Sequence, residues 1–151
     1  MDTKKKLGVA FLWHMHQPCY KVPDKDYYLL PWVRLHGIKD YYGMAKLVEK
    51  FDTIKVTFNF SGVLLEQLLD YVNNYAKDYY SILTLKNPLY ISREEKDFII
   101  DRFFSINFER FIRPHRRYLQ LYNKKLSPRA RFNTQDLGDL QALFNLCWFH
   151  P

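Results

Sequence analysis

The sequence predicts an α/β fold: the first two strand–helix units of a parallel barrel, followed by a helical insertion. Residues 7–13 form a continuous apolar run, which is typical of a buried parallel strand. Residues 54–60 alternate apolar and polar side chains, as a second strand would. Each run precedes a segment with helical spacing of its apolar residues, so the order is strand, helix, strand, helix.

The first strand ends at Pro18, because proline cannot donate to a strand ladder. Residues 19–35 are expected to form a long loop, and residues 38–51 a helix. After the second strand, Ser61 is expected to cap another helix. The predicted apolar face of that helix consists of Leu64, Leu65, Leu68, Leu69 and Val72.

No further strong strand pattern follows Asn74. Ser92 and Glu95 form a capping-box pattern for a helix to about Arg113, and a second helix is expected from there to about Lys125. Asn133 or Thr134 is expected to cap the last helix. The predicted apolar stripe of that helix consists of Leu137, Leu140, Phe144, Cys147 and Trp148.

These elements are too few for a complete barrel. The chain has 151 residues, whereas a typical barrel of this kind takes about 250. A parallel sheet also needs cover on both faces. We therefore expect residues 1–74 to form two barrel units and residues 75–151 a helical insertion, within a larger protein.

Composition excludes several classes of protein. Neither G-x-G-x-x-G nor G-x-x-x-x-G-K-[ST] occurs, so a nucleotide-binding fingerprint is absent. Cys19 and Cys147 form no C-x-x-C pair and predict a reducing, cytoplasmic location. No stretch approaches the roughly 20 apolar residues that cross a membrane. Lysines at residues 4–6 precede the first apolar run as in a signal peptide, but no small-residue cleavage site follows, which favours a core strand.

The net charge of +7 lies in residues 109–131, where eight basic residues face Glu109 alone. With Tyr118 and Tyr122, this segment could bind nucleic acid through phosphates and stacking. A solvated helical face, or a face that docks on acidic protein, is the favoured interpretation, so nucleic acid is not the expected partner. The basic residues are Arg110, Arg113, Arg116, Arg117, Lys124, Lys125, Arg129 and Arg131.

His14 and His16 are candidate functional residues. They are two apart at the predicted end of the first strand, so they share a face, and the carboxyl ends of parallel strands carry the site in such folds. Two imidazoles at this spacing suit a metal-dependent hydrolase. Alternatively, they hydrogen-bond a polyhydroxylated substrate, for which the loop offers aromatic platforms. Those platforms are Tyr20, Tyr27, Tyr28 and Trp32.

Four segments, in order, resemble glycoside hydrolase family 57. The first is His14-x-His16-Gln17-Pro18. The second is residues 30–36 (LPWVRLH), with DYY at residues 40–42. The third is residues 56–61 (VTFNFS), which continue into residues 63–68 (VLLEQL). The fourth is residues 139–141 (DLQ) and 144–149 (FNLCWF).

The resemblance implies a (β/α)7-type barrel that hydrolyses α-1,4 or α-1,6 glucan links, or transfers glucan segments, with retention of configuration. It also implies a Glu nucleophile and an Asp acid/base, and no metal or cofactor. The motifs that hold these carboxylates are not found in this sequence, so we assign no catalytic residue and expect the 151 residues alone to be inactive. Glu66 is expected to support packing, and Asp136 and Asp139 to favour a helix amino terminus.

The resemblance also suggests substrate-binding roles. The first motif would line the subsite around the reacting sugar, and residues of the second would border the same cleft. Asn59, after the second strand, could face it too. The expected partners are an α-glucan or malto-oligosaccharide and the remainder of the barrel. The expected substrate-binding residues are His14, His16, Gln17, Trp32, His36 and Asn59.

Overall fold

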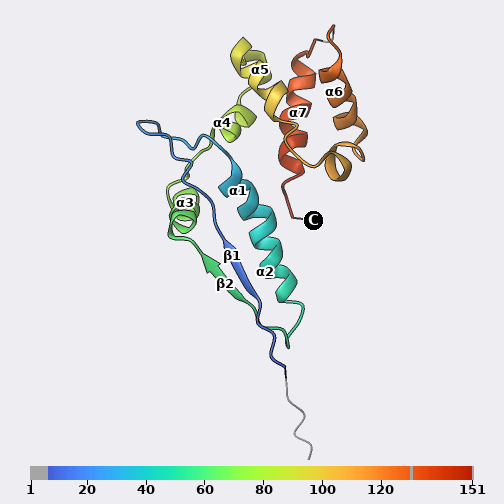
Figure 1. The fold of residues 1–151 in the computed structure, drawn as a ribbon. Coiled ribbons are helices and arrows are strands. Elements are labelled where there is room, and N and C mark those ends of the chain that lie inside the picture. The colour runs from blue at the N-terminus through green and yellow to red at the C-terminus, as the bar shows by residue number, and fades with distance from the viewer. Residues whose placement is uncertain (1–6, 130, 151) are drawn as a thin grey trace, which may run out of the picture. The chain divides into compact units, whose positions relative to one another are not determined.

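The computed structural model describes residues 7–129 and 131–150 and is drawn in Figure 1. The chain divides into two compact units. Within the described residues, the first unit consists of residues 7–20, 32–76 and His150, and the second of residues 21–31, 77–129 and 131–149. The lysines at residues 4–6 lie outside the described residues. A boundary at residue 74 between barrel units and insertion stays a prediction.

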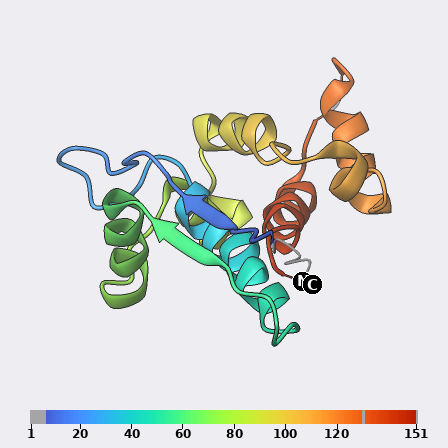
Figure 2. The same cartoon turned by 60° about the horizontal axis from the view of Figure 1, so that its bottom comes forward.

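The first unit holds a two-stranded parallel sheet, whose arrows run in the same direction in Figure 2. β1 (Leu12–Met15) pairs with β2 (Thr57–Phe60). Backbone bonds from Thr57 N to Phe11 O (2.9 Å) and from Ser61 N to Met15 O (3.0 Å) extend the pairing at both ends. The predicted α/β class and its parallel sheet are confirmed.

Both strands are shorter than predicted. β1 begins at Leu12 and includes His14 and Met15, while residues 7–11 lie outside it and are exposed. β2 begins at Thr57 rather than at residue 54. The prediction that the first strand is buried is wrong, because Leu12 remains 64% exposed. No other described strand pairs with the edge of β1 that faces away from β2.

One helical segment connects the two strands. It consists of α1 (Trp32–His36), a π-helical turn η1 (Gly37–Tyr41) and α2 (Tyr42–Val48). The residues at the junctions keep right-handed helical dihedrals, so the helix passes through η1 without a break. The predicted loop is therefore wrong from residue 32 onward. The helix starts directly after Pro31, which cannot donate a backbone hydrogen bond.

α3 (Gly62–Asn73) follows β2 and is capped by Ser61, whose Oγ accepts from Leu64 N at 3.4 Å, as predicted. Its predicted apolar face is only partly buried. Leu64 is fully buried, whereas Leu65, Leu69 and Val72 are exposed. Gln67, a polar residue, takes a buried place on this helix. The difference arises because the core of this unit is small, with Met15, Val33 and Leu64 at its centre.

The helices of the first unit cover one face of the sheet. α1 and α3 contact each other, and Met15 of β1 is buried against Val33 of α1 and Leu64 of α3. Side chains alternate between faces along a strand. His14 and Asn59 therefore point to the opposite face of the sheet, where both are exposed.

Tyr75, just after α3, has a positive φ of 54° and a side chain that is 83% exposed. A residue other than glycine in the left-handed conformation destabilises the folded state by about 1–2 kcal/mol. A glycine lowers stability by about 0.4–1 kcal/mol, because it gives the unfolded chain more conformational freedom. We expect Tyr75→Gly to raise the free energy of unfolding by about 0.5 kcal/mol in urea titrations. Tyr90→Gly, at another exposed tyrosine but without positive φ, should lower it. Equal effects of the two variants would contradict the prediction.

The second unit is helical. It contains α4 (Tyr79–Leu85), η2 (Pro88–Tyr90), α5 (Arg93–Arg102), η3 (Phe108–Ile112), α6 (Arg116–Leu126) and α7 (Thr134–Leu146). Its core is aromatic: Tyr80 stacks on Phe103 at 5.5 Å, and Phe103 lies 4.8 Å from Phe144. The buried Tyr118 hydroxyl donates to Phe103 O, and burial raises the pKa of this phenol.

The caps of this unit agree with the sequence at two helices. Ser92 and Glu95 form the predicted capping box at α5, and Asn133, rather than Thr134, caps α7. α5 ends at Arg102 instead of about residue 113, because Asn107 starts the separate turn η3 by accepting from Arg110 N at 2.9 Å. α4 and its capping box were not predicted.

Candidate functional site

His14 and Asn59 meet at the carboxyl end of the parallel pair. They are directly opposite in the strand register, and His14 Nδ1 lies 3.0 Å from Asn59 Oδ1. His16 follows β1, and its ring stacks on that of His14 with 6.1 Å between centroids and 13° between planes. The two imidazoles therefore share one face, as the spacing predicts.

Gln17 is held by two tyrosines. The Tyr20 hydroxyl donates to Gln17 Oε1 at 2.7 Å, and Gln17 Nε2 donates to the Tyr41 hydroxyl at 3.2 Å. Burial, with a smaller effect of Tyr41, raises the pKa of Tyr20, so its hydroxyl keeps the proton that it donates. The amide plane of Gln17 is thereby fixed.

Gln67 binds the backbone of the residues that follow the histidines. Its side chain is 2% exposed. Its Nε2 donates to Pro18 O at 3.0 Å and to Val63 O at 3.1 Å, and its Oε1 accepts from Tyr20 N at 2.9 Å. All of its hydrogen-bonding atoms thus contact backbone groups, and this fixes residues 18–20 on α3.

Trp32 and His36 of the helical segment lie near Tyr41, which binds Gln17. The rings of Trp32 and His36 lie 6.2 Å apart, and those of His36 and Tyr41 lie 6.3 Å apart. His36 Nδ1 contacts Asp40 Oδ2 at 2.5 Å, across the π-helical turn. Because Tyr41 also binds Gln17, these contacts connect the second motif to the first.

Side-chain contacts bring the six predicted site residues together in two groups within the first unit. His14 contacts His16 and Asn59, and Gln17 is joined through Tyr41 to His36 and Trp32. The chain connects the groups from His16 to Gln17, and His14 and Asn59 lie on the face of the sheet opposite α1 and α3. We name this set, together with Tyr20, Asp40, Tyr41 and Gln67, the histidine cluster. The sequence reasoning assigned no role to Asp40, Tyr41 or Gln67. Two features of the sequence could have indicated these residues. His36 and Asp40 have i,i+4 spacing, and Gln67 lies among the leucines of α3.

Two of the predicted aromatic platforms belong to the second unit. Tyr28 is 3% exposed and belongs to the second unit, where Tyr79 N binds its carbonyl oxygen at 2.8 Å. Tyr27 packs on Tyr79 with 5.9 Å between ring centroids. The platform prediction is wrong for Tyr28, because its ring is buried.

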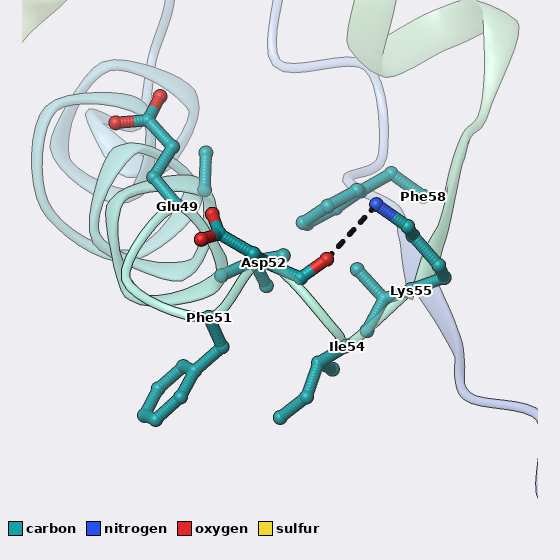
Figure 3. Close-up of a pocket in the computed structure, with 9 residues that line it drawn as sticks. Glu49, Phe51, Asp52, Ile54, Lys55 and Phe58 are labelled. Carbon is teal, nitrogen blue, oxygen red and sulfur yellow. Dashed lines mark hydrogen bonds between the residues drawn. The ribbon is translucent and has the colours of Figure 1, made fainter.

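Two hollows of the first unit are lined by residues outside the histidine cluster. Figure 3 shows one of about 410 Å³, where Glu49, Phe51 and Asp52 follow α2 and Lys55 Nζ donates to Asp52 O at 3.2 Å. A smaller apolar hollow of about 190 Å³ is lined by Phe11, Trp13 and Phe51, among others. Both lie toward the amino end of β2, whereas parallel α/β folds place their sites at the carboxyl ends of strands.

The basic segment is partly neutralised. Arg113 pairs with Glu109 at 2.6 Å, and Lys125 lies 3.6 Å from Asp101. Arg117 binds both Asp136 (2.8 Å) and Asp139 (2.7 Å). Lys124 binds Asp136 at 2.6 Å. Part of the basic segment thus has acidic partners within this chain, and Asp136 and Asp139 do more than complement a helix terminus. The interpretation of the segment as a solvated or protein-docking face stays a prediction.

Residues 7–129 and 131–150 hold neither a cluster of metal ligands nor a helix suited to a membrane. No three His, Cys, Asp or Glu side chains come together there to hold a metal ion. None of the helices described is both long enough and apolar enough to span a membrane. Cys19 is exposed and Cys147 buried, and these two described residues form no disulfide.

The family model for Glycosyl hydrolase family 57 matches residues 10–151, which include the whole histidine cluster. The chain belongs to glycosyl hydrolase family 57. Membership supports glycoside hydrolase chemistry with a glucan substrate at the level of the family. No curated protein and no solved structure matches this family 57 chain.

Proposed function

We propose that this family 57 chain forms the sugar-binding amino-terminal part of a retaining α-glucan hydrolase or glucanotransferase. The observation that carries the proposal is the histidine cluster at the carboxyl end of β1 and β2. Imidazole, amide and phenol groups can bind sugar hydroxyls, and aromatic rings suit the apolar faces of sugars. The proposed substrate-binding residues are His14, His16, Gln17, Trp32, His36 and Asn59.

We further propose that β1 and β2 are the first strands of a (β/α)7-type barrel. α1 and α3 cover one face of the sheet, as the outer helices of a barrel do, and leave His14 and Asn59 on the other face. Apolar side chains such as Leu12 and Phe60 remain exposed in this unit. Further strands would pair with the sheet edges and bury these side chains.

In this proposal, the catalytic Glu and Asp come from the later strands. A retaining pair must lie about 5–5.5 Å apart, so that one carboxylate attacks the anomeric carbon while the other protonates the leaving oxygen. Asp40, the carboxylate of the histidine cluster, is bound to His36, and Glu66 is exposed on α3. Cys19 and Cys147 form no disulfide, which supports a cytoplasmic location.

Hydrolysis of 4-nitrophenyl maltoheptaoside tests the proposal. The 151-residue chain alone should be inactive, and a longer polypeptide that adds the later family strands should be active. In the longer polypeptide, His16→Ala should lower kcat/KM at least about tenfold, the value of one hydrogen bond to substrate. His115→Ala, at an exposed histidine of the second unit, is the matched control.

Two results would contradict the proposal. Activity of the 151-residue chain would show that it holds its own catalytic pair. An unchanged kcat/KM in both His14→Ala and His16→Ala would remove the sugar-binding role of the histidines.

A further inference from the structure

The hydrogen bond between His14 and Asn59 has a defined donor and a defined acceptor. Its two atoms, Nδ1 of the imidazole and Oδ1 of the amide, lie 3.0 Å apart. A carbonyl oxygen only accepts hydrogen bonds, so the proton must be on Nδ1. A neutral imidazole carries a single N–H, and its Nε2 is then left with a lone pair.

We propose that Asn59 is a positioning residue that holds neutral His14 in the Nδ1–H tautomer. This makes Nε2 an acceptor, which can receive a hydrogen bond from a hydroxyl of the substrate. The role toward substrate rests on the proposed function, whereas the tautomer itself does not.

The strand register explains how Asn59 can hold the tautomer of His14. His14 and Asn59 are cross-strand partners on the face of the sheet opposite α1 and α3, and the neighbouring pairs Trp13–Phe58 and Met15–Phe60 flank them. Trp13 and Phe58 form an edge-to-face contact at 5.2 Å, which helps to keep the two strands in this register. The amide is thus presented to Nδ1 by paired backbone rather than by a loop.

His16 provides an internal comparison. Its ring stacks on that of His14, but it makes no hydrogen bond like that of His14 within the described residues. Free imidazole side chains favour the Nε2–H form, so His16 should follow that preference. The two stacked rings would then differ: His14 offers an acceptor at Nε2, and His16 a donor.

Long-range ¹H–¹⁵N correlation spectra of the ¹⁵N-labelled 151-residue chain test the tautomer. At pH 8, above the ordinary histidine pKa of about 6.5, His14 should show a protonated Nδ1 and an unprotonated Nε2. His16 and His115 should show mainly the reverse. Asn59→Leu should return His14 to the Nε2–H form, and Asn59→Asp, which keeps an acceptor oxygen, should retain Nδ1–H.

The control is Asn123→Leu, at an exposed asparagine of α6 in the second unit, which should leave the His14 signals unchanged. A wild-type His14 in the Nε2–H form would overturn the proposal, as would an Asn59→Leu variant whose His14 remains in the Nδ1–H form. Because no sugar is present, this result is independent of the activity test above. In the longer polypeptide, Asn59→Leu should lower kcat/KM about fivefold, within the range of one hydrogen bond.

Discussion

Replacing Asp136 by alanine is expected to lower the free energy of unfolding by about 3 kcal/mol. The side chain of Asp136 is only 5% exposed, and its carboxylate binds Lys124 at 2.6 Å and Arg117 at 2.8 Å. It also accepts from Asn133 N at 2.9 Å, which completes the capping box of α7. The substitution would leave two cations of α6 without this partner and one backbone N–H unsatisfied.

Urea denaturation of the wild type and variant measures this loss. Asp97→Ala, at an exposed aspartate of α5, is the matched control and should change stability by less than about 0.5 kcal/mol. A loss at Asp136 no larger than that of the control would show that the ion pairs between α6 and α7 contribute nothing net.

The same residue predicts a pH dependence. Burial raises the pKa of Asp136, but hydrogen bonds from Lys124, Asn133 N and Arg117 outweigh it, so the folded pKa lies below the ordinary value. The unfolded chain therefore takes up the proton first as pH falls. The stabilisation should be complete above about pH 5 and should decline as pH falls through about 3.9, the unfolded pKa, toward the folded one. Asp136→Asn should flatten this part of the stability curve.

Replacing Gln67 by leucine is expected to cost about 2–3 kcal/mol and to release residues 18–20 from α3. The variant keeps an apolar side chain of similar size but removes the bonds to Pro18 O, Val63 O and Tyr20 N. Tyr20 then loses both its backbone partner and the fixed position from which its hydroxyl holds Gln17.

Hydrogen exchange at the Tyr20 amide reports this release directly. Exchange should accelerate at least about thirtyfold in Gln67→Leu, as expected for about 2 kcal/mol. Glu66→Leu, at the exposed neighbour on α3, should leave that amide protected. Unchanged protection of Tyr20 in Gln67→Leu would mean that the loop is held by other contacts.

Features that depend on near neighbours were predictable from the sequence. Ser61, Ser92 and Asn133 each accept from a backbone N–H three residues later, so the cap and its partner lie in one short stretch of sequence. The shared face of His14 and His16 follows in the same way from strand alternation. The family resemblance, which rests on motifs of a few residues, was confirmed.

Features that depend on partners distant in the sequence were not predictable from it. Gln67 is buried because its amide meets the backbone of residues 18–20, and nothing in the sequence of α3 shows that those residues will lie there. Asp136 likewise finds Arg117 and Lys124 on another helix. The exposure of Leu65 and Leu69 could not be predicted either, since helical spacing identifies an apolar face but not what covers it.

The π-helical turn η1 bears on how this protein can tolerate insertions and deletions. A π turn accommodates one residue more than an α-helix does, while the helix on either side continues. Deleting one residue from Gly37–Tyr41 would give an unbroken α-helix in which α1 and α2 keep their relative orientation. A deletion at residues 37–39 would leave His36 and Asp40 three positions apart instead of four, which changes the geometry of their contact. A lineage could therefore lose this residue with little harm to folding, but with an altered contact between His36 and Asp40.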